Sequence, residues 1–201
     1  MKKLFGSIAV ILVLTGCTPK YDDPHTPRAS KGSPSAQIKV EEFGDFQCPA
    51  CGQAYPVVKR LQAKYDQRVN WQFINFPLTS VHPYAFNAAL AAACANDQDK
   101  FWEYHDTLYE NQDHLSRGDL EKYAGTVGLD VEKFKACLGS RAKASFVQAD
   151  IAEADKRGVD STPTFFVNGV AIPDWSKLES EIDRLMGTPA PPVTPGAPQP
   201  E

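Results

Sequence analysis

The segment that decides the fold is Ile38-Lys39-Val40-Glu41-Glu42-Phe43-Gly44-Asp45-Phe46-Gln47-Cys48-Pro49-Ala50-Cys51. Residues 37–43 are rich in β-branched and aromatic side chains and stop at a glycine, which predicts a strand. A short loop follows, and then a proline suited to a first helical turn and apolar residues at helical spacing to about residue 65. The pattern therefore places Cys48 at a helix N-terminus, where unpaired N–H groups and the helix dipole favour a thiolate.

Two cysteines separated by two residues at a helix start can form an intramolecular disulfide. We expect Cys48 to be the exposed nucleophile and Cys51 the resolving thiol, with exchange through a mixed disulfide. The same spacing is half of a zinc site, but zinc needs a second close pair of ligands. Neither the remaining cysteines nor the four histidines supply such a pair in the sequence. The spacing therefore indicates redox chemistry and no metal.

The rest of the folded chain shows three strand-forming stretches after the first helix, with a long helical block between the first and the second. The expected elements are a strand at 69–76, helices at 85–96, 101–111, 119–127, 131–138 and 142–156, strands at 164–167 and 170–172, and a closing helix at 175–186. Gly128, Gly139 and Gly158 stand where helix C-caps are expected. Asn168-Gly169, between the last two strands, is a strong hairpin signal.

The predicted order is β-α-β, a block of helices, and β-β-α. Such an order predicts an α/β fold in which the first two strands are parallel and joined by a right-handed crossover. The closing hairpin adds antiparallel strands to the same sheet, and the helical block forms a cap beside it. We expect one domain at 37–187, with the helical insertion at about 80–158.

The two ends of the chain read as segments outside this domain. Lys2 and Lys3 precede an apolar stretch too short to span a bilayer, and Leu14-Thr15-Gly16-Cys17 resembles the bacterial lipobox. This predicts a signal peptide at 1–16, a lipidated Cys17 and a flexible tether at 17–36. A plain secretory signal with an incidental Cys17 is the alternative, and both predict export to a compartment where disulfides persist. The proline-rich segment 188–201 reads as a disordered tail, either a solvated spacer or a peptide ligand.

Composition supports an exported globular protein. The 201 residues are 42% hydrophobic and 23% charged, with a formal net charge of −4 and no basic run, which gives no electrostatic case for nucleic-acid binding. Of the five cysteines, lipidation of Cys17 would leave an even number. Cys94 and Cys137 fall in separate cap helices and could form a structural disulfide, act as a second redox pair or remain free thiols. The structural disulfide is favoured because neither cysteine stands at a helix start.

Several motifs in this order resemble the DsbA-like group of the thioredoxin superfamily, over about residues 38–186. They are the segment from Phe43 to Cys51, Asn75-Phe76-Pro77-Leu78 with His82-Pro83, Lys100-Phe101-Trp102-Glu103-Tyr104-His105, and Thr162-Pro163-Thr164-Phe165-Phe166-Val167-Asn168-Gly169. The resemblance implies a thioredoxin fold with a helical insertion. It also implies that Pro163 is cis and lies against the cysteine pair, that Thr162 tunes the sulfurs, and that Glu42 is a buried acid that assists proton transfer.

Two positions qualify this resemblance. Glu42 shares a strand face with Ile38 and Val40, which is compatible with burial, although an exposed edge charge is an open alternative. Ala50 stands where the best-known oxidants of the family carry histidine, and alanine cannot stabilise the thiolate electrostatically.

The expected function is that of a lipid-anchored oxidase, in the periplasm or at the cell surface, that introduces disulfides into extracytoplasmic proteins. No cofactor is expected. The resemblance implies that a membrane redox partner would reoxidise the pair. The alternatives are a reductase or isomerase of the same fold, and a tethered peptide-binding protein whose Cys48–Cys51 bond is only structural.

Overall fold

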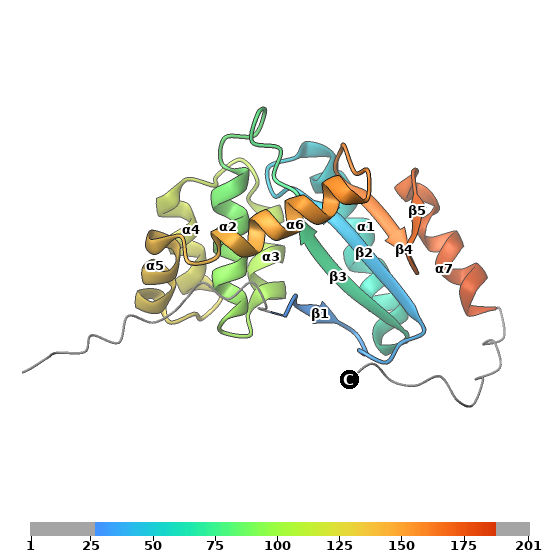
Figure 1. Ribbon diagram of the computed structural model, residues 1–201. Helices are drawn as coiled ribbons and strands as arrows, with labels where there is room; N and C mark the ends of the chain where they lie inside the picture. The colour runs from blue at the N-terminus through green and yellow to red at the C-terminus, as the bar shows by residue number, and fades with distance from the viewer. Residues whose placement is uncertain (1–26, 188–201) are drawn as a thin grey trace, which may run out of the picture.

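The computed structural model describes residues 27–187, so the expected signal peptide, lipidated Cys17 and proline-rich tail lie outside the described residues. At its centre is a five-stranded sheet with the order β1-β3-β2-β4-β5 (Figure 1). The strands are β1 Ser30–Lys31, β2 Ile38–Gly44, β3 Val69–Asn75, β4 Thr164–Val167 and β5 Val170–Ile172. β2 and β3 are parallel, and β4 and β5 join the sheet antiparallel, as the element order predicted. β1, which was not predicted, pairs antiparallel with β3.

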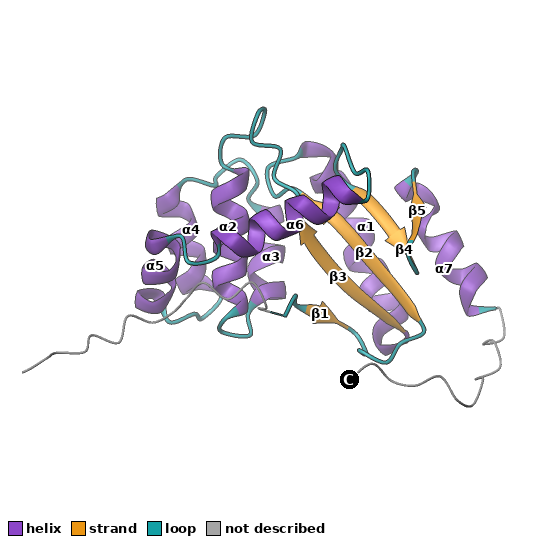
Figure 2. Ribbon diagram, in the orientation of Figure 1, coloured by secondary structure: helices purple, strands orange, loops and turns teal. Residues whose placement is uncertain are grey.

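Helices cover both faces of the sheet (Figure 2). α1 (Pro49–Tyr65) and α7 (Leu178–Met186) lie on one face, and α6 (Ala144–Lys156) crosses the other. Alternation along β2 sends Val40 into the core under α1 and Phe43 into the core under α6. Because both faces are buried, β2 carries apolar residues of both parities, as expected for a central strand.

The remaining helices form the cap beside the sheet. They are α2 (Ala85–Asn96), α3 (Phe101–Glu110), α4 (Arg117–Thr126) and α5 (Val131–Ser140), and two short 3₁₀ turns, η1 (Asp66–Arg68) and η2 (Trp175–Lys177), lie outside it. α2 is buried almost all round, and its many alanines let the neighbouring helices approach closely.

Most predicted element boundaries agree with the structure within a few residues. Gly128 and Gly158 follow helix ends with φ of +76° and +69°, as expected of C-caps. The expectation for Gly139 is wrong, because α5 continues to Ser140 and Arg141 adopts the left-handed conformation instead. The turn at Asn168 and Gly169 joins the paired residues of β4 and β5, as predicted.

The N-terminal segment differs from the prediction of a tether up to residue 36. β1 pairs with the edge of β3, and Arg28 forms ion pairs with Asp150 at 2.6 Å and Glu153 at 2.7 Å on α6. Asp150 is fully buried and also accepts hydrogen bonds from the backbone and side chain of Asn75. The folded part therefore includes residues 27–36, which carry no periodic signal in the sequence.

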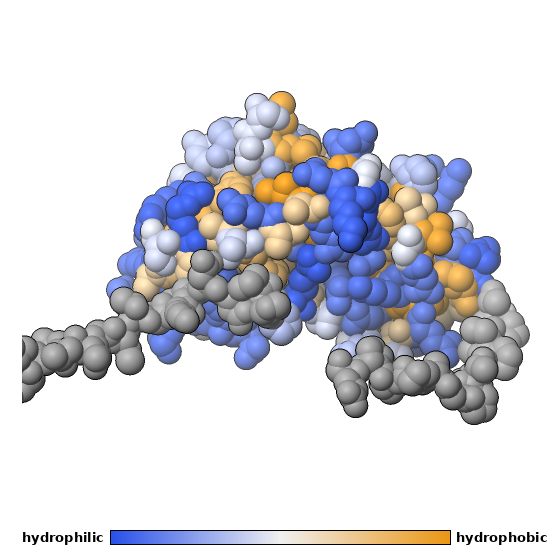
Figure 3. All heavy atoms as spheres, in the orientation of Figure 1, coloured by the Kyte–Doolittle hydropathy of each residue, from blue (hydrophilic) through white to orange (hydrophobic). Residues whose placement is uncertain are grey.

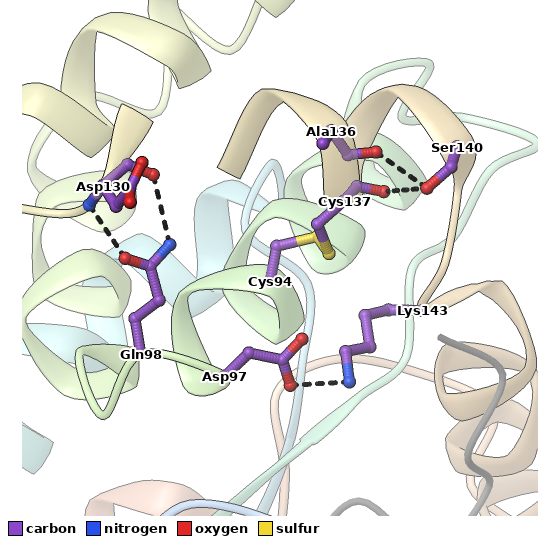
Figure 4. The surroundings of a disulfide bond; sticks show 8 residues. All are labelled: Cys94, Asp97, Gln98, Asp130, Ala136, Cys137, Ser140 and Lys143. Carbon is purple, nitrogen blue, oxygen red and sulfur yellow. Dashed lines mark hydrogen bonds and ion pairs between the residues drawn. A yellow bond between two sulfur atoms is a disulfide. The ribbon is translucent and has the colours of Figure 1, made fainter. Parts of the chain in front are cut away.

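A disulfide joins α2 to α5 through Cys94 and Cys137, and we call it the cap disulfide (Figure 4). Both residues are buried, at 1% and 4% exposure. Around it, Lys143 forms an ion pair with Asp97 at 2.6 Å, and the Gln98 side chain bonds the backbone of Asp130. The disulfide shows that Cys94 and Cys137 are not free thiols. The contacts between Gln98 and Asp130 also join the end of α2 to the start of α5.

Candidate functional site

Cys48 occupies the N-cap of α1, and Pro49 follows in the first turn. The Cys48 N–H donates to the carbonyl of Asp45 at 3.1 Å, which closes the turn between β2 and α1. The site lies where β2 ends, so the strand and the helix together fix the sulfur. Cys48 is 6% exposed, and the expected exposed nucleophile is therefore a largely buried one.

The pKa of the Cys48 thiol is lowered to about 5. A hydrogen bond with the Cys51 side chain is the largest cause, and it outweighs the opposing effect of burial. Thr162 and the backbone N–H groups of Cys51 and Ala50 lower the pKa further. Hydrogen bonds at the helix start therefore stabilise the Cys48 thiolate, although the side chain of Ala50 between the two cysteines carries no charge.

Cys51 lies one turn inside the helix and is fully buried. Burial, Cys48 and the nearby Glu42 all raise its pKa far above the ordinary range. Glu42 is 6% exposed, so the alternative of an exposed edge charge does not hold. Its Oε1 atom has no hydrogen-bond partner among the described residues, and burial raises its pKa to about 8.

The Thr162–Pro163 peptide bond is cis, and this segment lies against Cys48. The Thr162 carbonyl is 3.4 Å from the Cys48 Sγ atom. β4 begins at the next residue and runs antiparallel to β2, with Thr164 opposite Phe43. The sheet therefore brings a segment from the end of the chain to the start of α1, with the geometry that the sequence resemblance implied.

A group of hydrogen-bonded polar residues around Asp45, next to the site, was not predicted from the sequence. Asp45 is 1% exposed and accepts hydrogen bonds from the N–H groups of Gln47 at 2.7 Å and Leu78 at 2.8 Å. Its carboxylate also contacts His82 Nδ1 at 2.7 Å. Asp45 and His82 both stand in quoted motifs, but their spacing in the sequence gives no sign of contact.

The cap contributes two further residues to the site, Gln112 and Tyr109, neither of which the sequence motifs single out as a site residue. Gln112 donates through Nε2 to the carbonyls of Phe46 at 2.9 Å and Cys48 at 3.0 Å. Tyr109 reaches the same place from α3, and its buried hydroxyl has no partner among the described residues. The cap therefore completes the site as well as covering the sheet.

Exposed apolar side chains stand beside the site. Val81 is 67% exposed and Tyr84 is 47% exposed, in the loop between β3 and α2. The Tyr84 N–H donates to the side chain of Gln47, next to Cys48. Figure 3 shows apolar residues at the top of the view, where this loop projects, as well as elsewhere on the same face. The loop that carries these exposed apolar side chains therefore lies next to the cysteine pair.

Within residues 27–187, no cluster of three or more His, Cys, Asp or Glu side chains could hold a metal ion. In the same range no helix is both long enough and apolar enough to cross a membrane.

Comparison with known proteins gives matches over most of the chain. A family model described as Thioredoxin matches residues 25–185. The probable disulfide bond formation protein D of Bacillus anthracis is 34% identical over 175 residues, with 80% of this chain and 79% of that protein covered. The Na(+)/H(+) antiporter NhaA 3 of Salinispora tropica is 45% identical over 166 residues, which cover 83% of this chain. The chain spans only 24% of that antiporter's length.

Two solved structures share the fold. BdbD from Bacillus subtilis, in its oxidised form, has a TM-score of 0.70 and 26% identity, with 78% of this chain and 91% of that chain covered. A thioredoxin-like oxidoreductase from Silicibacter pomeroyi has a TM-score of 0.71 and 26% identity, with 84% and 96% covered. Together with the cysteine pair at the start of α1 and the cis-proline beside it, these matches show that the chain belongs to the thioredoxin family, in its DsbA-like group of thiol–disulfide oxidoreductases.

Proposed function

We propose that this protein exchanges disulfides with extracytoplasmic proteins through Cys48 and Cys51, and that it acts as an oxidase. One observation carries the proposal: Cys48 stands at a helix N-cap with a pKa lowered to about 5, next to a buried Cys51. A stabilised thiolate is both the nucleophile and the good leaving group that thiol–disulfide exchange needs.

In the oxidising direction, a substrate thiolate attacks Cys48 Sγ of the oxidised pair. The Cys48–Cys51 bond breaks, and Cys51 leaves as a thiolate. Glu42, whose pKa of about 8 keeps it mostly protonated at pH 7, gives a proton to Cys51. A second substrate thiolate then attacks the substrate sulfur of the mixed disulfide, and Cys48 leaves as a stable thiolate. Two electrons remain on the pair, and a membrane redox partner would remove them.

The segment at Thr162 and Pro163 would align the substrate. The Thr162 carbonyl lies 3.4 Å from Cys48 Sγ, so a polypeptide paired with this backbone would present its sulfur to Cys48. The exposed Val81 and Tyr84 extend the same surface with apolar area. Because contacts of this kind are not specific to one sequence, they suit a protein that acts on many exported chains.

The direction of electron flow follows from the free energy of the reduced pair. At pH 7, a Cys48 pKa of about 5 stabilises the reduced form by roughly 2 kcal/mol more than the pKa of about 7 in thioredoxin does. That difference is roughly 50 mV, which predicts a reduction potential at or above about −220 mV. Ala50 favours the alternative of a reductase or isomerase, because it adds no charge that would raise the potential further.

Equilibration of the pair against glutathione, followed by alkylation and mass spectrometry, tests this function. A potential between about −120 mV and about −220 mV would support an oxidase, and one near about −270 mV would support a reductase. Cys48→Ser should abolish exchange. A wild-type pair that exchanges with nothing would favour the peptide-binding alternative.

The cellular location is part of the proposal. The lipobox at Cys17 would anchor the mature protein to a bacterial membrane and place the site outside the cytoplasm. Growth with a labelled fatty acid should label the wild-type protein but not Cys17→Ser. Equal labelling of the two would refute lipidation at this residue.

A further inference from the structure

Tyr109, on α3, carries a hydroxyl group that the chemistry above does not use. The residue is 6% exposed, and its hydroxyl has no hydrogen-bond partner among the described residues. Burial of an unpaired polar atom costs free energy, so each such atom needs an explanation. Because a phenylalanine would fill the same space without that cost, the hydroxyl itself is the feature to explain.

The ring of Tyr109 is held firmly at the site. It stacks on Tyr55 of α1 with 5.2 Å between ring centroids, and it packs against Phe46 at 5.1 Å. The hydroxyl lies over Gly44, where an added Cβ atom would come within 2.9 Å of its oxygen. Gly44 and Glu42 share a strand face, so the hydroxyl lies on the α1 side of the sheet, at the end of β2.

The surroundings of the hydroxyl keep it a donor. Burial raises the pKa of Tyr109 well above its ordinary value, and the charges of Cys51, Glu42 and Asp45 raise it further. The Cys51 side chain also lies near enough to raise it by hydrogen bonding, although the present geometry is not that of a formed bond. The phenol therefore retains its proton at neutral pH. A permanent O–H donor in a buried site stabilises whichever neighbour acquires negative charge.

We propose that Tyr109 is a further residue of the redox site, whose phenol O–H donates a hydrogen bond to Cys51 Sγ when that sulfur is a thiolate. The inference rests on the proposed exchange activity. When the Cys48–Cys51 bond breaks, its electron pair stays on Cys51, and the new bond joins Cys48 to the substrate sulfur. In the reverse step the Cys51 thiolate attacks Cys48 Sγ and the substrate leaves as a thiolate. The Tyr109 proton stays on its oxygen in both directions.

The size of the effect follows from the strength of a hydrogen bond to a charged atom. Loss of such a bond reduces the thiolate fraction of Cys51 by roughly tenfold or more. A thiol of higher pKa is also a better nucleophile, with a Brønsted slope of about 0.4–0.5, which recovers roughly threefold. We therefore expect ring closure by Cys51 to be about threefold slower or more without the hydroxyl.

Tyr109→Phe removes only this hydroxyl. Reduced protein would be mixed with oxidised glutathione, quenched in acid and analysed by mass spectrometry, which separates attack by Cys48 from closure by Cys51. Tyr104→Phe is the matched control, because it removes a buried hydroxyl that bonds the Leu120 carbonyl within the cap. We expect unchanged attack by Cys48 in both variants, and slower closure in Tyr109→Phe alone.

Three results would overturn the inference. Closure at the wild-type rate in Tyr109→Phe would show that the hydroxyl does not act on Cys51. Equal slowing of both steps would show a general disturbance of the site. If the wild-type protein formed no mixed disulfide with glutathione, the proposed function itself would fail, and the inference with it.

Discussion

The low pKa of Cys48 predicts how the stability of the reduced protein depends on pH. The folded-state pKa is about 5 and the ordinary value is 9.0. A group whose pKa is lowered by folding stabilises the protein fully above its unfolded pKa, and this contribution is lost as the pH falls towards the folded pKa. Between pH 9 and pH 5 the loss is about 1.4 kcal/mol per pH unit.

At pH 7 the contribution of Cys48 is therefore roughly 3 kcal/mol, and at pH 4 it is close to zero. Oxidation removes it, because a sulfur in a disulfide does not titrate. As the pH rises from 4 to 7, the free energy of unfolding of the reduced protein should therefore increase by this amount relative to that of the oxidised protein. In terms of redox chemistry, the same free energy makes the pair more oxidising by roughly 60 mV than one with an unperturbed thiol.

Urea denaturation of the reduced protein at several pH values measures this contribution. Cys48→Ser is the control, because carboxylates and histidines titrate in the same way in both proteins and their effect cancels in the difference. The pH dependence of iodoacetamide alkylation at Cys48 gives the pKa directly. An alkylation midpoint above about pH 8, or a stability difference that does not change between pH 4 and pH 7, would refute the assignment of a stabilised thiolate.

Three further predictions concern the stability of the structure that surrounds the site. Arg28→Ala leaves the buried Asp150 without its cation and should lower the free energy of unfolding in urea by about 2–3 kcal/mol, whereas the exposed Arg117→Ala should change it by less than about 0.5 kcal/mol. Reduction of the cap disulfide opens a loop of 43 residues and should lower the free energy of unfolding by about 4 kcal/mol. The measurement needs a variant without the Cys48–Cys51 pair, and a loss below about 1 kcal/mol would argue against a structural clamp. Gly44→Ala would push a methyl group into the Phe73 ring and, less closely, the Tyr109 hydroxyl, and should lower the melting temperature, equivalent to about 1–3 kcal/mol. Gly118→Ala has open space around it and should not.

Most of the fold could be predicted from the sequence because the signals for it are local. The strand before Gly44, the proline after Cys48 and the Asn168-Gly169 turn each depend on a few neighbouring residues, and the structure agrees with all of them. The prediction at Gly139 failed because a glycine within a helix is tolerated at modest cost, so its presence does not by itself end the helix.

The parts of the site that were missed depend on contacts between distant residues. Asp45 meets His82 across 37 positions, and no spacing rule connects a loop aspartate to a histidine so far away. Tyr109 falls in the helix expected at 101–111, and its aromatic ring is compatible with a place in the cap core whether or not the hydroxyl has a function. Only the fold shows that the ring reaches the cysteine pair.

The docked N-terminal segment has a practical consequence for any shortened form of this protein. A chain cut at residue 37, where the periodic sequence begins, would lack β1 and Arg28. The outer edge of β3 would then present unpaired backbone groups to other molecules, and exposed edges of this kind promote aggregation. A soluble form for crystallisation or assay should therefore begin before residue 27, so that the sheet keeps its fifth strand.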